Sequence, residues 1–411
     1  MATPRPRPAR PRPNPLKGLG DLPLGPLLAV VGLLVAALIS LVFFFGRFDL
    51  VPGTGGSGQQ GPVRTPNPSV VFTPSPPPDD SYHLLGTVLF VKNGDIWALT
   101  GSTVTRLTTS GYASSPTWSP DGKSIYYVET RHKSALAPYQ GGSTGYELNY
   151  PVIMRMNADG SAAKVIKDSL IRYSGDRYFF SWYLQPDVSP DGKTIALVTD
   201  VPDPFNRDVV LGFMPAAGGT VTVPRLPEFA PLGHSDPAWS PDGKRVAFTY
   251  NQRSGAIGNP RIAIYTLATK KMAYLSGPGY ARPSWSPDGR FIAAERTDGK
   301  GRDIVILSAR DGSEVAHLTN DGTSFGPTWS PDGGAIAFLH IAGTGIDLHL
   351  VVLGPGNPFA VKDVLELTTS SLLDGASRPA WYVPPSQLPT PAPTPTPTLA
   401  PSSQPASSGT P

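Results

Sequence analysis

Pro116-Thr117-Trp118-Ser119-Pro120-Asp121-Gly122 is the stretch that decides the fold, because the chain repeats it. Successive copies lie 44 to 70 residues apart, and a sixth, shortened copy at Pro379–Val383 runs into two prolines instead of the turn. A repeat of about 40–50 residues with one aromatic residue per unit is typical of a β-propeller, in which each unit forms one blade. The full copies are Pro116–Gly122, Pro186–Gly192, Pro237–Gly243, Pro283–Gly289 and Pro327–Gly333.

Each repeat has the local chemistry of a β-blade. Pro-Asp-Gly favours a turn, because Pro presets φ, Asp bonds the nearby backbone and Gly tolerates a positive φ. A short β-like run follows each turn, as at Arg245–Tyr250, and a second follows later, as at Ile262–Leu267. No long apolar pattern of helical period occurs after residue 82, so the pattern predicts an all-β domain over residues 82–384.

The repeat unit Pro-x-Trp-Ser-Pro-Asp-Gly-Lys-x-Ile-Ala-Phe resembles the WD40-like repeat of TolB-type β-propellers over about residues 86–383. The resemblance implies a protein-docking platform outside the cytoplasm. The chain departs from TolB because it lacks the N-terminal α/β domain and carries an apolar segment instead, which puts any Tol-system partner in doubt. Oligogalacturonate lyases also resemble this repeat and use a metal held by histidines near the channel, which implies an alternative function as a lyase-like carbohydrate-active enzyme.

The number of blades follows from the two ends of the repeat region. Thr87–Val91, Asp95–Leu99 and Val104–Thr108 have the pattern of the three outer strands of a blade without its inner strand. Ala380–Val383 is an inner strand without a blade. We therefore predict a six-bladed β-propeller closed by pairing of the C-terminal strand with the N-terminal blade, which removes exposed sheet edges.

The N-terminal region predicts a membrane anchor. Residues 1–22 form a basic, Pro-rich tail, and residues 23–45 are predicted as a transmembrane helix, since Leu27–Phe45 is a run of 19 uncharged residues. Basic residues before it place the N-terminus in the cytoplasm and the propeller outside, extracellular or periplasmic. The alternative is a cleaved signal peptide, but this apolar run is longer than the usual 7–15 residues and ends in Phe43-Phe44-Phe45.

Composition separates the tails from the folded part. Residues 46–81 are rich in Gly, Ser and Pro and predict a flexible extracytoplasmic linker, and residues 385–411 predict a Pro/Thr/Ser-rich disordered tail, either bare or O-glycosylated. The chain has no cysteine, which excludes disulfides. Of the net charge of +3, the first 22 residues hold +4, so the rest lacks the positive excess of a nucleic-acid binder.

Two catalytic patterns and two repeated residues are explained without catalysis. Gly141–Gly145 fits G-x-S-x-G and Gly53–Gly58 fits G-x-G-x-x-G, but neither lies in the strand–helix setting that its chemistry requires. The repeated Trp is expected to pack blade against blade, and the repeated Asp to be a turn residue. We therefore predict no catalytic residues.

The irregular parts of the repeats predict the binding face, because insertions in repeat proteins map to loops. The 70-residue repeat carries its extra length in Glu129–Tyr150 and Ser169–Gln185, which we interpret as loops forming an aromatic and basic lid. Residues just before each inner strand are expected at the channel mouth. The alternatives are a loop cluster that packs on itself and ordinary solvated loop residues. The predicted ligand- or partner-binding residues are Tyr112, Tyr139, Tyr146, Arg177, Tyr183, His234, Asp236, Tyr280, Arg282, Phe325 and Arg378.

The six histidines are scattered along the chain. His132, His234 and His340 are candidates for one face, but no pair has the spacing of metal ligands, so no metal and no cofactor are predicted. The sequence thus favours a non-enzymatic binding or scaffold module for a protein or envelope polysaccharide, held to the membrane by residues 24–45, with the lyase-like enzyme as the alternative.

Overall fold

A computed structural model describes residues 83–139, 142–227, 232–254, 257–299, 301–354 and 359–388, all within one compact unit. The expected cytoplasmic tail, transmembrane helix and linker lie outside these residues, as does the tail from residue 389 on. Within the described part, no helix combines the length and the apolar character that a membrane crossing needs.

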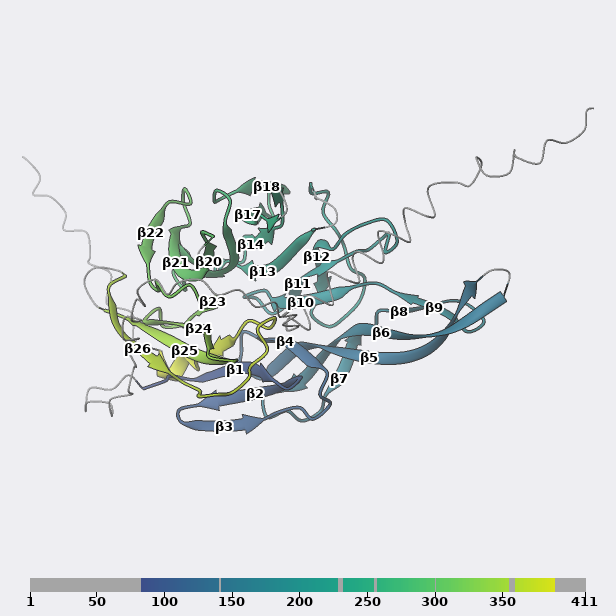
Figure 1. Ribbon diagram of the computed structural model, residues 1–411, viewed down its shortest axis with the longest axis horizontal. Coiled ribbons are helices and arrows are strands. Elements are labelled where there is room, and N and C mark those ends of the chain that lie inside the picture. Colours follow the sequence, from purple (N-terminus) through teal and green to yellow (C-terminus); the bar gives the residue numbers. More distant parts are fainter. Residues whose placement is uncertain are drawn as a thin grey trace, which may run out of the picture. The chain divides into compact units, whose positions relative to one another are not determined.

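The described residues form an all-β, six-bladed propeller (Figure 1). Five of its sheets have four antiparallel strands, and the third has three, with a single bridge between Phe213 and Thr222 where a fourth would lie. Blade 1 contains β27 (Ala380–Tyr382), β1 (Thr87–Lys92), β2 (Asp95–Thr100) and β3 (Thr103–Arg106). Blade 2 contains β4 (Ala113–Trp118), β5 (Ser124–Tyr139), β6 (Gly142–Asn157) and β7 (Lys164–Lys167), and blade 3 contains β10 (Tyr183–Val188), β11 (Thr194–Thr199) and β12 (Val210–Pro215).

The other three blades follow the same order from the axis outward. Blade 4 contains β13 (His234–Trp239), β14 (Arg245–Tyr250), β17 (Arg261–Thr266) and β18 (Lys271–Tyr274). Blade 5 contains β19 (Tyr280–Trp285), β20 (Phe291–Thr297), β21 (Arg302–Ser308) and β22 (Glu314–His317). Blade 6 contains β23 (Ser324–Trp329), β24 (Ala335–Ala342), β25 (Gly345–Leu353) and β26 (Val361–Glu366). A small hairpin of β15 (Arg253–Ser254) and β16 (Ile257–Gly258) extends blade 4.

The ring closes as the sequence predicts. β27 pairs antiparallel with β1, with Val88 opposite Trp381, and the inner strands are in contact with one another all around the ring. The Trp381 indole donates to the Leu85 carbonyl at 2.8 Å. The chain continues past the expected boundary at residue 384 into the 3₁₀ helix η1 (Pro385–Gln387), where the Gln387 side chain accepts from the Gly86 N–H at 2.9 Å.

The Ser-Pro-Asp-Gly turns hold each inner strand to the next strand. Ser119 donates to the Asp121 carboxylate at 2.6 Å and accepts from the Ser124 N–H at 2.9 Å. The same serine–aspartate bond recurs in the next three copies. The serine hydroxyl holds the pKa of Asp121 below its usual value. The repeated aspartate is therefore a turn residue, as the sequence predicts.

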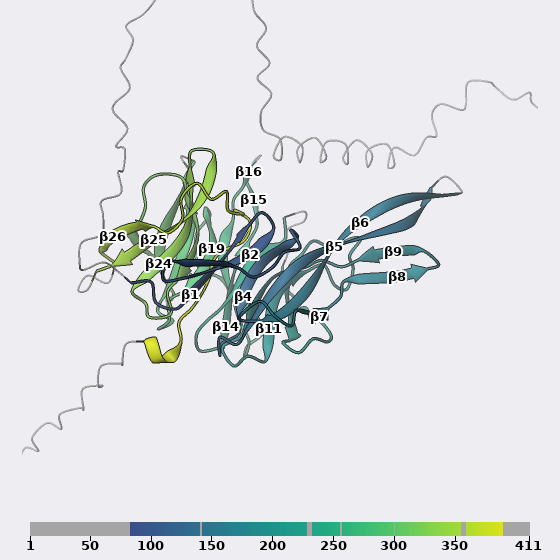
Figure 2. The same ribbon diagram turned by 90° about the horizontal axis from the view of Figure 1, so that it is seen from below.

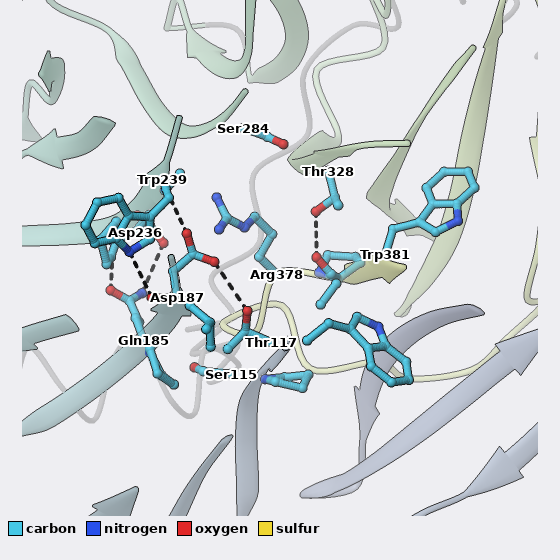
Figure 3. A pocket seen from close by; sticks show the side chains of 18 of the residues that line it. Ser115, Thr117, Gln185, Asp187, Asp236, Trp239, Ser284, Thr328, Arg378 and Trp381 are labelled. Carbon is cyan, nitrogen blue, oxygen red and sulfur yellow. Dashed lines mark hydrogen bonds between the residues drawn. The ribbon is translucent and has the colours of Figure 1, made fainter. Parts of the chain in front are cut away.

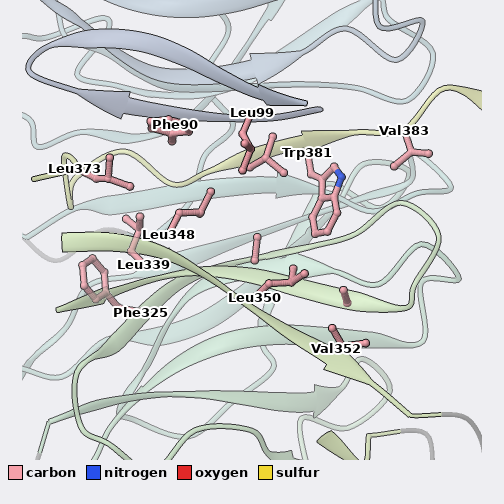
Figure 4. Close-up of a cluster of buried hydrophobic side chains, with 13 residues drawn as sticks. Phe90, Leu99, Phe325, Leu339, Leu348, Leu350, Val352, Leu373, Trp381 and Val383 are labelled. Atoms are coloured by element: carbon pink, nitrogen blue, oxygen red, sulfur yellow. The ribbon is translucent and has the colours of Figure 1, made fainter. Parts of the chain in front are cut away.

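The repeated tryptophans pack between blades. The indoles of Trp239 and Trp285 each donate to a backbone carbonyl of the preceding blade, both at 3.1 Å. Trp381 belongs to a buried cluster that joins blade 6, through Leu348 and Leu350, to blade 1, through Phe90 (Figure 4). The predicted packing role is confirmed, and the first and last blades share one core.

The inserted segments form strands, so the prediction of a lid made of loops is wrong. Residues 129–150 belong to the long hairpin of β5 and β6, which pair without a break from Ser124↔Asn157 to Tyr139↔Gly142. Within residues 169–185, β8 (Leu170–Ser174) pairs with β9 (Arg177–Phe180). Both hairpins project away from the blades (Figures 1 and 2), and we call residues 130–150 with β8 and β9 the arm. Most of the paired backbone groups bond within each hairpin, and the Leu136 N–H of one hairpin donates to the Asp176 carbonyl of the other at 2.9 Å.

Candidate functional site: the central cavity

A cavity of about 320 Å³ lies on the propeller axis among the six inner strands (Figure 3). Its walls contain the residue that follows the repeated proline in every blade. Because equivalent positions come together around the axis, one repeated sequence position supplies a ring of six side chains. These residues are Thr117, Asp187, Ala238, Ser284, Thr328 and Ala380.

The residue before the repeated proline has an unusual backbone. Ser115, Gln185, Asp236 and Arg282 have φ between 49° and 53°, the left-handed region that residues with a Cβ rarely adopt. The strand pairing shifts register at each of these positions. Ser115, Gln185 and Asp236 line the cavity. This recurring bulge changes the direction of the side chain before the repeated proline, so that in three blades it lines the cavity.

Asp187 is the one ionisable member of the ring. Its carboxylate accepts from the Thr117 hydroxyl at 3.3 Å and from the Trp239 N–H at 2.8 Å (Figure 3). Protein surrounds it except where it faces the cavity, and this burial raises its pKa, an effect that the positive charge of Arg378 partly opposes.

Arg378 enters the cavity from the segment before β27 and is drawn between Asp187 and Thr328 in Figure 3. Its guanidinium donates to the Pro283 carbonyl at 2.5 Å. Thr328 donates to the Pro379 carbonyl at 2.6 Å, and Ser377 accepts from the Ser115 N–H at 3.1 Å. The closing segment is thus held from blades 2, 5 and 6, which positions Arg378, the one arginine among the described residues that line the cavity.

A belt of polar side chains continues from the cavity into blades 4 and 5. Gln185 and Asp236 exchange two hydrogen bonds, of 3.0 and 2.8 Å, and Thr249 donates to Asp236 at 3.2 Å. Thr249 also accepts from the Arg282 N–H at 2.9 Å, and the Arg282 guanidinium lies 3.7 Å from Glu295. Burial raises the pKa of Glu295, whereas Arg282 lowers it. The cavity residues Gln185 and Asp236 are therefore held in fixed orientations.

The structure places three of the residues predicted from sequence at or beside this site. Asp236 and Arg378 line the cavity, and Arg282 joins the belt and donates to the Gly375 carbonyl at 3.0 Å. Tyr112 is half exposed with its ring edge-to-face on His132, and Tyr280 donates to Glu314 at 3.0 Å, so both lie away from the cavity wall.

Three other predicted residues are not at the mouth. His234 and Phe325 are each 1% exposed and Tyr183 is 5% exposed, so their side chains belong to the interior. His234 accepts from the Leu211 N–H and donates to the Pro227 carbonyl at 2.9 Å, and burial lowers its pKa to about 4. His234 and Tyr183 are the first residues of their inner strands and point into their blades, whereas Phe325 is the second residue of β23 and packs in the core shared by blades 6 and 1.

The remaining predicted residues belong to the arm. Tyr146 donates to the Tyr178 carbonyl at 2.5 Å, which joins the two hairpins, and Arg177 begins β9. The side chain of Tyr139 lies outside the described residues. None of the described arm residues reaches the cavity wall.

Sequence reasoning missed Thr117, Gln185 and Asp187. A signal for Asp187 was present, because the second copy departs from the others at two adjacent positions. It has Asp where they have Thr, Ser or Ala, and Val188 where they have Trp. Gln185 and Thr117 had no such signal.

The histidines named for a metal site are not assembled. His132 contacts Asn149 through a 2.7 Å hydrogen bond, His234 is enclosed in blade 4, and the His340 ring lies 4.5 Å from His349 in blade 6. Among the residues that the structure describes, no three His, Cys, Asp or Glu side chains are arranged to hold a metal ion.

Solved structures share this fold. TolB from Acinetobacter baumannii matches with a TM-score of 0.53 and 21% identity over 72% of this chain, which spans 66% of the length of that protein, just under two thirds. A putative TolB from Agrobacterium tumefaciens matches with a TM-score of 0.50 and 17% identity, covering 74% of this chain and 95% of that one. An oligogalacturonate lyase in complex with manganese matches more weakly, with a TM-score of 0.39 and 14% identity over 64% of this chain and 84% of that one.

No family model and no curated protein sequence matches the chain. The structural likeness therefore establishes a TolB-type six-bladed propeller fold, and a fold of this kind occurs with many functions, so the central cavity is the feature that bears on function.

Proposed function

We propose that this chain is a membrane-anchored, extracytoplasmic propeller that acts as a non-enzymatic binding module for a protein partner. In this proposal residues 24–45 hold the chain in the membrane, the N-terminus is cytoplasmic, and the central cavity binds part of the partner. The fold likeness to TolB structures supports a binding or scaffold role.

The observation that carries the proposal is Asp187 beside Arg378 in the cavity wall. The five equivalent ring positions hold only Thr, Ser or Ala, so a propeller of this kind closes without a charge there. A buried carboxylate costs free energy that an uncharged residue would not. An aspartate whose pKa is influenced by a nearby arginine, in the one full copy that departs from the others at two adjacent positions, supports a role in binding.

The size of the cavity limits what enters it. A volume of about 320 Å³ is at the low end of the range for ligand sites. It holds a side chain or a short segment of a partner, not a domain. A polypeptide segment supplies donors for Asp187, acceptors for Arg378 and backbone groups for the hydroxyls of Thr117 and Ser284. Sugar hydroxyls offer the same chemistry, so the experiment below distinguishes a protein partner from a polysaccharide.

Photo-crosslinking in the cell of origin tests this proposal. A photoreactive amino acid replaces Ala238 in the cavity wall of the full chain, and a matched chain carries it at Val315, an exposed residue of β22. We expect protease-sensitive adducts from position 238 that Arg378→Gln strongly reduces, and few from position 315. Carbonate-washed membranes should retain the chain and its adducts.

Three outcomes would contradict the proposal in different ways. Equal adducts at both positions would mean that the cavity is not the site. Adducts removed by glycosidases but not by proteases would identify an envelope polysaccharide as the partner. Release of the chain by carbonate would refute the membrane anchor, but it would not affect the conclusion that the partner binds at the cavity.

A further inference from the structure

The β8–β9 hairpin of the arm has two different faces. Its register places Leu170 opposite Phe180 and Ile171 opposite Phe179. Because side chains alternate across a strand, Leu170 and Phe180 share one face, and Ile171 and Phe179 share the other. Tyr173 lies at the register shift between Arg172 and Ser174, where its side chain is exposed. Leu170 and Phe180 pack against the core of blade 2, so the second face has no partner within the hairpin.

This second face is apolar and exposed. Tyr173 is 74% exposed and Ile171 38% exposed. Phe205, from the segment between β11 and β12, is also 74% exposed, and its ring lies 5.2 Å from that of Phe179. We call Ile171, Tyr173, Phe179 and Phe205 the aromatic patch. Scattered exposed apolar residues are ordinary, but a group of neighbouring ones on a projecting element indicates a contact surface.

The patch differs in kind from the central cavity. None of its residues lines that cavity, and Ile171, Tyr173 and Phe179 lie on a hairpin that projects from the blades (Figure 2). Sites for sugars and other small ligands are concave and carry convergent polar groups. A projecting apolar face with exposed aromatic side chains, among them a tyrosine, suits instead the boundary between lipid headgroups and acyl chains, where aromatic side chains gather.

The length of the chain outside the structure brings a membrane within reach. The apolar stretch 24–45 is followed by 37 residues before His83, the first described residue. Whatever its conformation, a segment of that length spans at most about 130 Å at ~3.5 Å per residue. Tethering makes a second membrane contact effectively intramolecular, so even a weak surface affinity becomes significant.

We propose that the aromatic patch inserts into the interface of the bilayer that carries the anchor. The arm then gives the propeller a second, reversible membrane contact. This contact sets the orientation of the propeller, and therefore of its central cavity, relative to the membrane surface. This inference rests on the anchored topology proposed above.

Spin labelling of the full chain tests the inference. Because the chain has no cysteine of its own, an introduced cysteine is the single position that takes the label. The chain is reconstituted in phosphatidylcholine–phosphatidylglycerol vesicles with a nitroxide at Ser174→Cys, next to the patch, or at Thr103→Cys on β3. We expect the label at position 174 to collide several-fold less with a water-soluble nickel complex and more with oxygen than the label at position 103.

Matched variants assign the effect to the patch. Tyr173→Ser with Phe205→Ser, both at highly exposed positions, should return the label at position 174 to the aqueous phase. Val104→Ser with Val364→Ser removes exposed apolar side chains from β3 and β26 and should leave the label in the lipid phase. Unchanged thermal melts of both double variants exclude unfolding.

The failures of the two proposals are distinguishable. If carbonate strips the chain from the vesicles, the anchor is refuted. If the chain is retained but the label at position 174 remains as aqueous as that at position 103, the patch inference alone is wrong. Dipolar broadening that disappears on dilution with unlabelled chain would show that a second copy covers the patch, which also overturns membrane insertion.

Discussion

Asp187 and His234 are both titratable residues of inner strands, and their surroundings give them different roles. Asp187 faces the cavity with Arg378 nearby, whereas His234 lies between Phe248 and Tyr250 with both ring nitrogens bonded to backbone groups. A carboxylate that keeps one side open can meet a ligand. A histidine enclosed in this way contributes to stability instead.

The pKa of His234 predicts a loss of stability in mild acid. Burial lowers the pKa from 6.5 to about 4 in the folded state, with Arg207 acting in the same direction. The contribution of neutral His234 to the free energy of unfolding is therefore fully present above pH 6.5. It declines as the pH falls towards 4 and is smaller by about 2–3 kcal/mol at pH 4.5. Urea unfolding of the wild type and of His234→Gln across this range measures it.

The variant should be less stable at pH 7.5 but lose less stability on acidification. His132→Gln, at an exposed position of the arm, is the control and should follow the wild-type profile. Parallel pH profiles for the wild type and His234→Gln would show that this histidine does not titrate as its burial implies.

At the scale of the element, β27 has only three residues and still closes the ring. Trp381 is the buried residue of this strand, with its side chain 8% exposed, and its indole donates a hydrogen bond to the Leu85 carbonyl. A strand that pairs over only three residues is weakly held by its backbone hydrogen bonds. The packing of the Trp381 indole between blades 1 and 6 therefore has to stabilise the pairing of β27 with β1 (Figure 4).

Trp381→Ala should lower the free energy of unfolding by about 3–5 kcal/mol, the range for removing a large buried aromatic side chain. Trp182→Ala removes the same side chain at a position that is 41% exposed and should cost clearly less, about 1 kcal/mol. Denaturant titration of the two variants provides the comparison. Equal losses would mean that the β27 indole does not hold the ring closed.

At the scale of the whole molecule, the two ends of the propeller depend on each other. Blade 1 is built from strands nearly 300 residues apart, and the Tyr382 hydroxyl also reaches the Asp121 carbonyl of blade 2 at 3.1 Å. Without β27, the β1 edge would be open and free to pair with another chain.

A chain truncated after Gly375 should therefore melt at a clearly lower temperature and self-associate. A peptide of residues 376–388 added in trans should restore the monomer and raise the melting temperature, because it supplies the missing strand. The same peptide with Trp381→Ala is the control and should restore little. Sedimentation and thermal melts follow both effects. A truncated chain that stays monomeric with an unchanged melt would refute closure as a source of stability.

The sequence by itself determined the all-β class, the number of blades and their closure. Turn chemistry and strand alternation are local properties, and they recur at a regular spacing in five full copies and one shortened copy of the repeat. The sequence did not show that residues 129–150 pair as one long hairpin, since that segment departs from the repeat. These residues were expected to be loops that cover the cavity. They form strands of the arm instead, and the arm projects away from the axis.

Only the tertiary structure decided which side chains meet in the cavity. Asp187 and Arg378 are 191 residues apart and come together because the ring closes. Left-handed backbone at Gln185 and Asp236, with the register shift beside each, leaves these side chains in the cavity wall, while His234 and Phe325 are buried in the blades. Such a shift changes the side of the sheet on which a residue lies, and it depends on neighbouring strands that no local pattern describes.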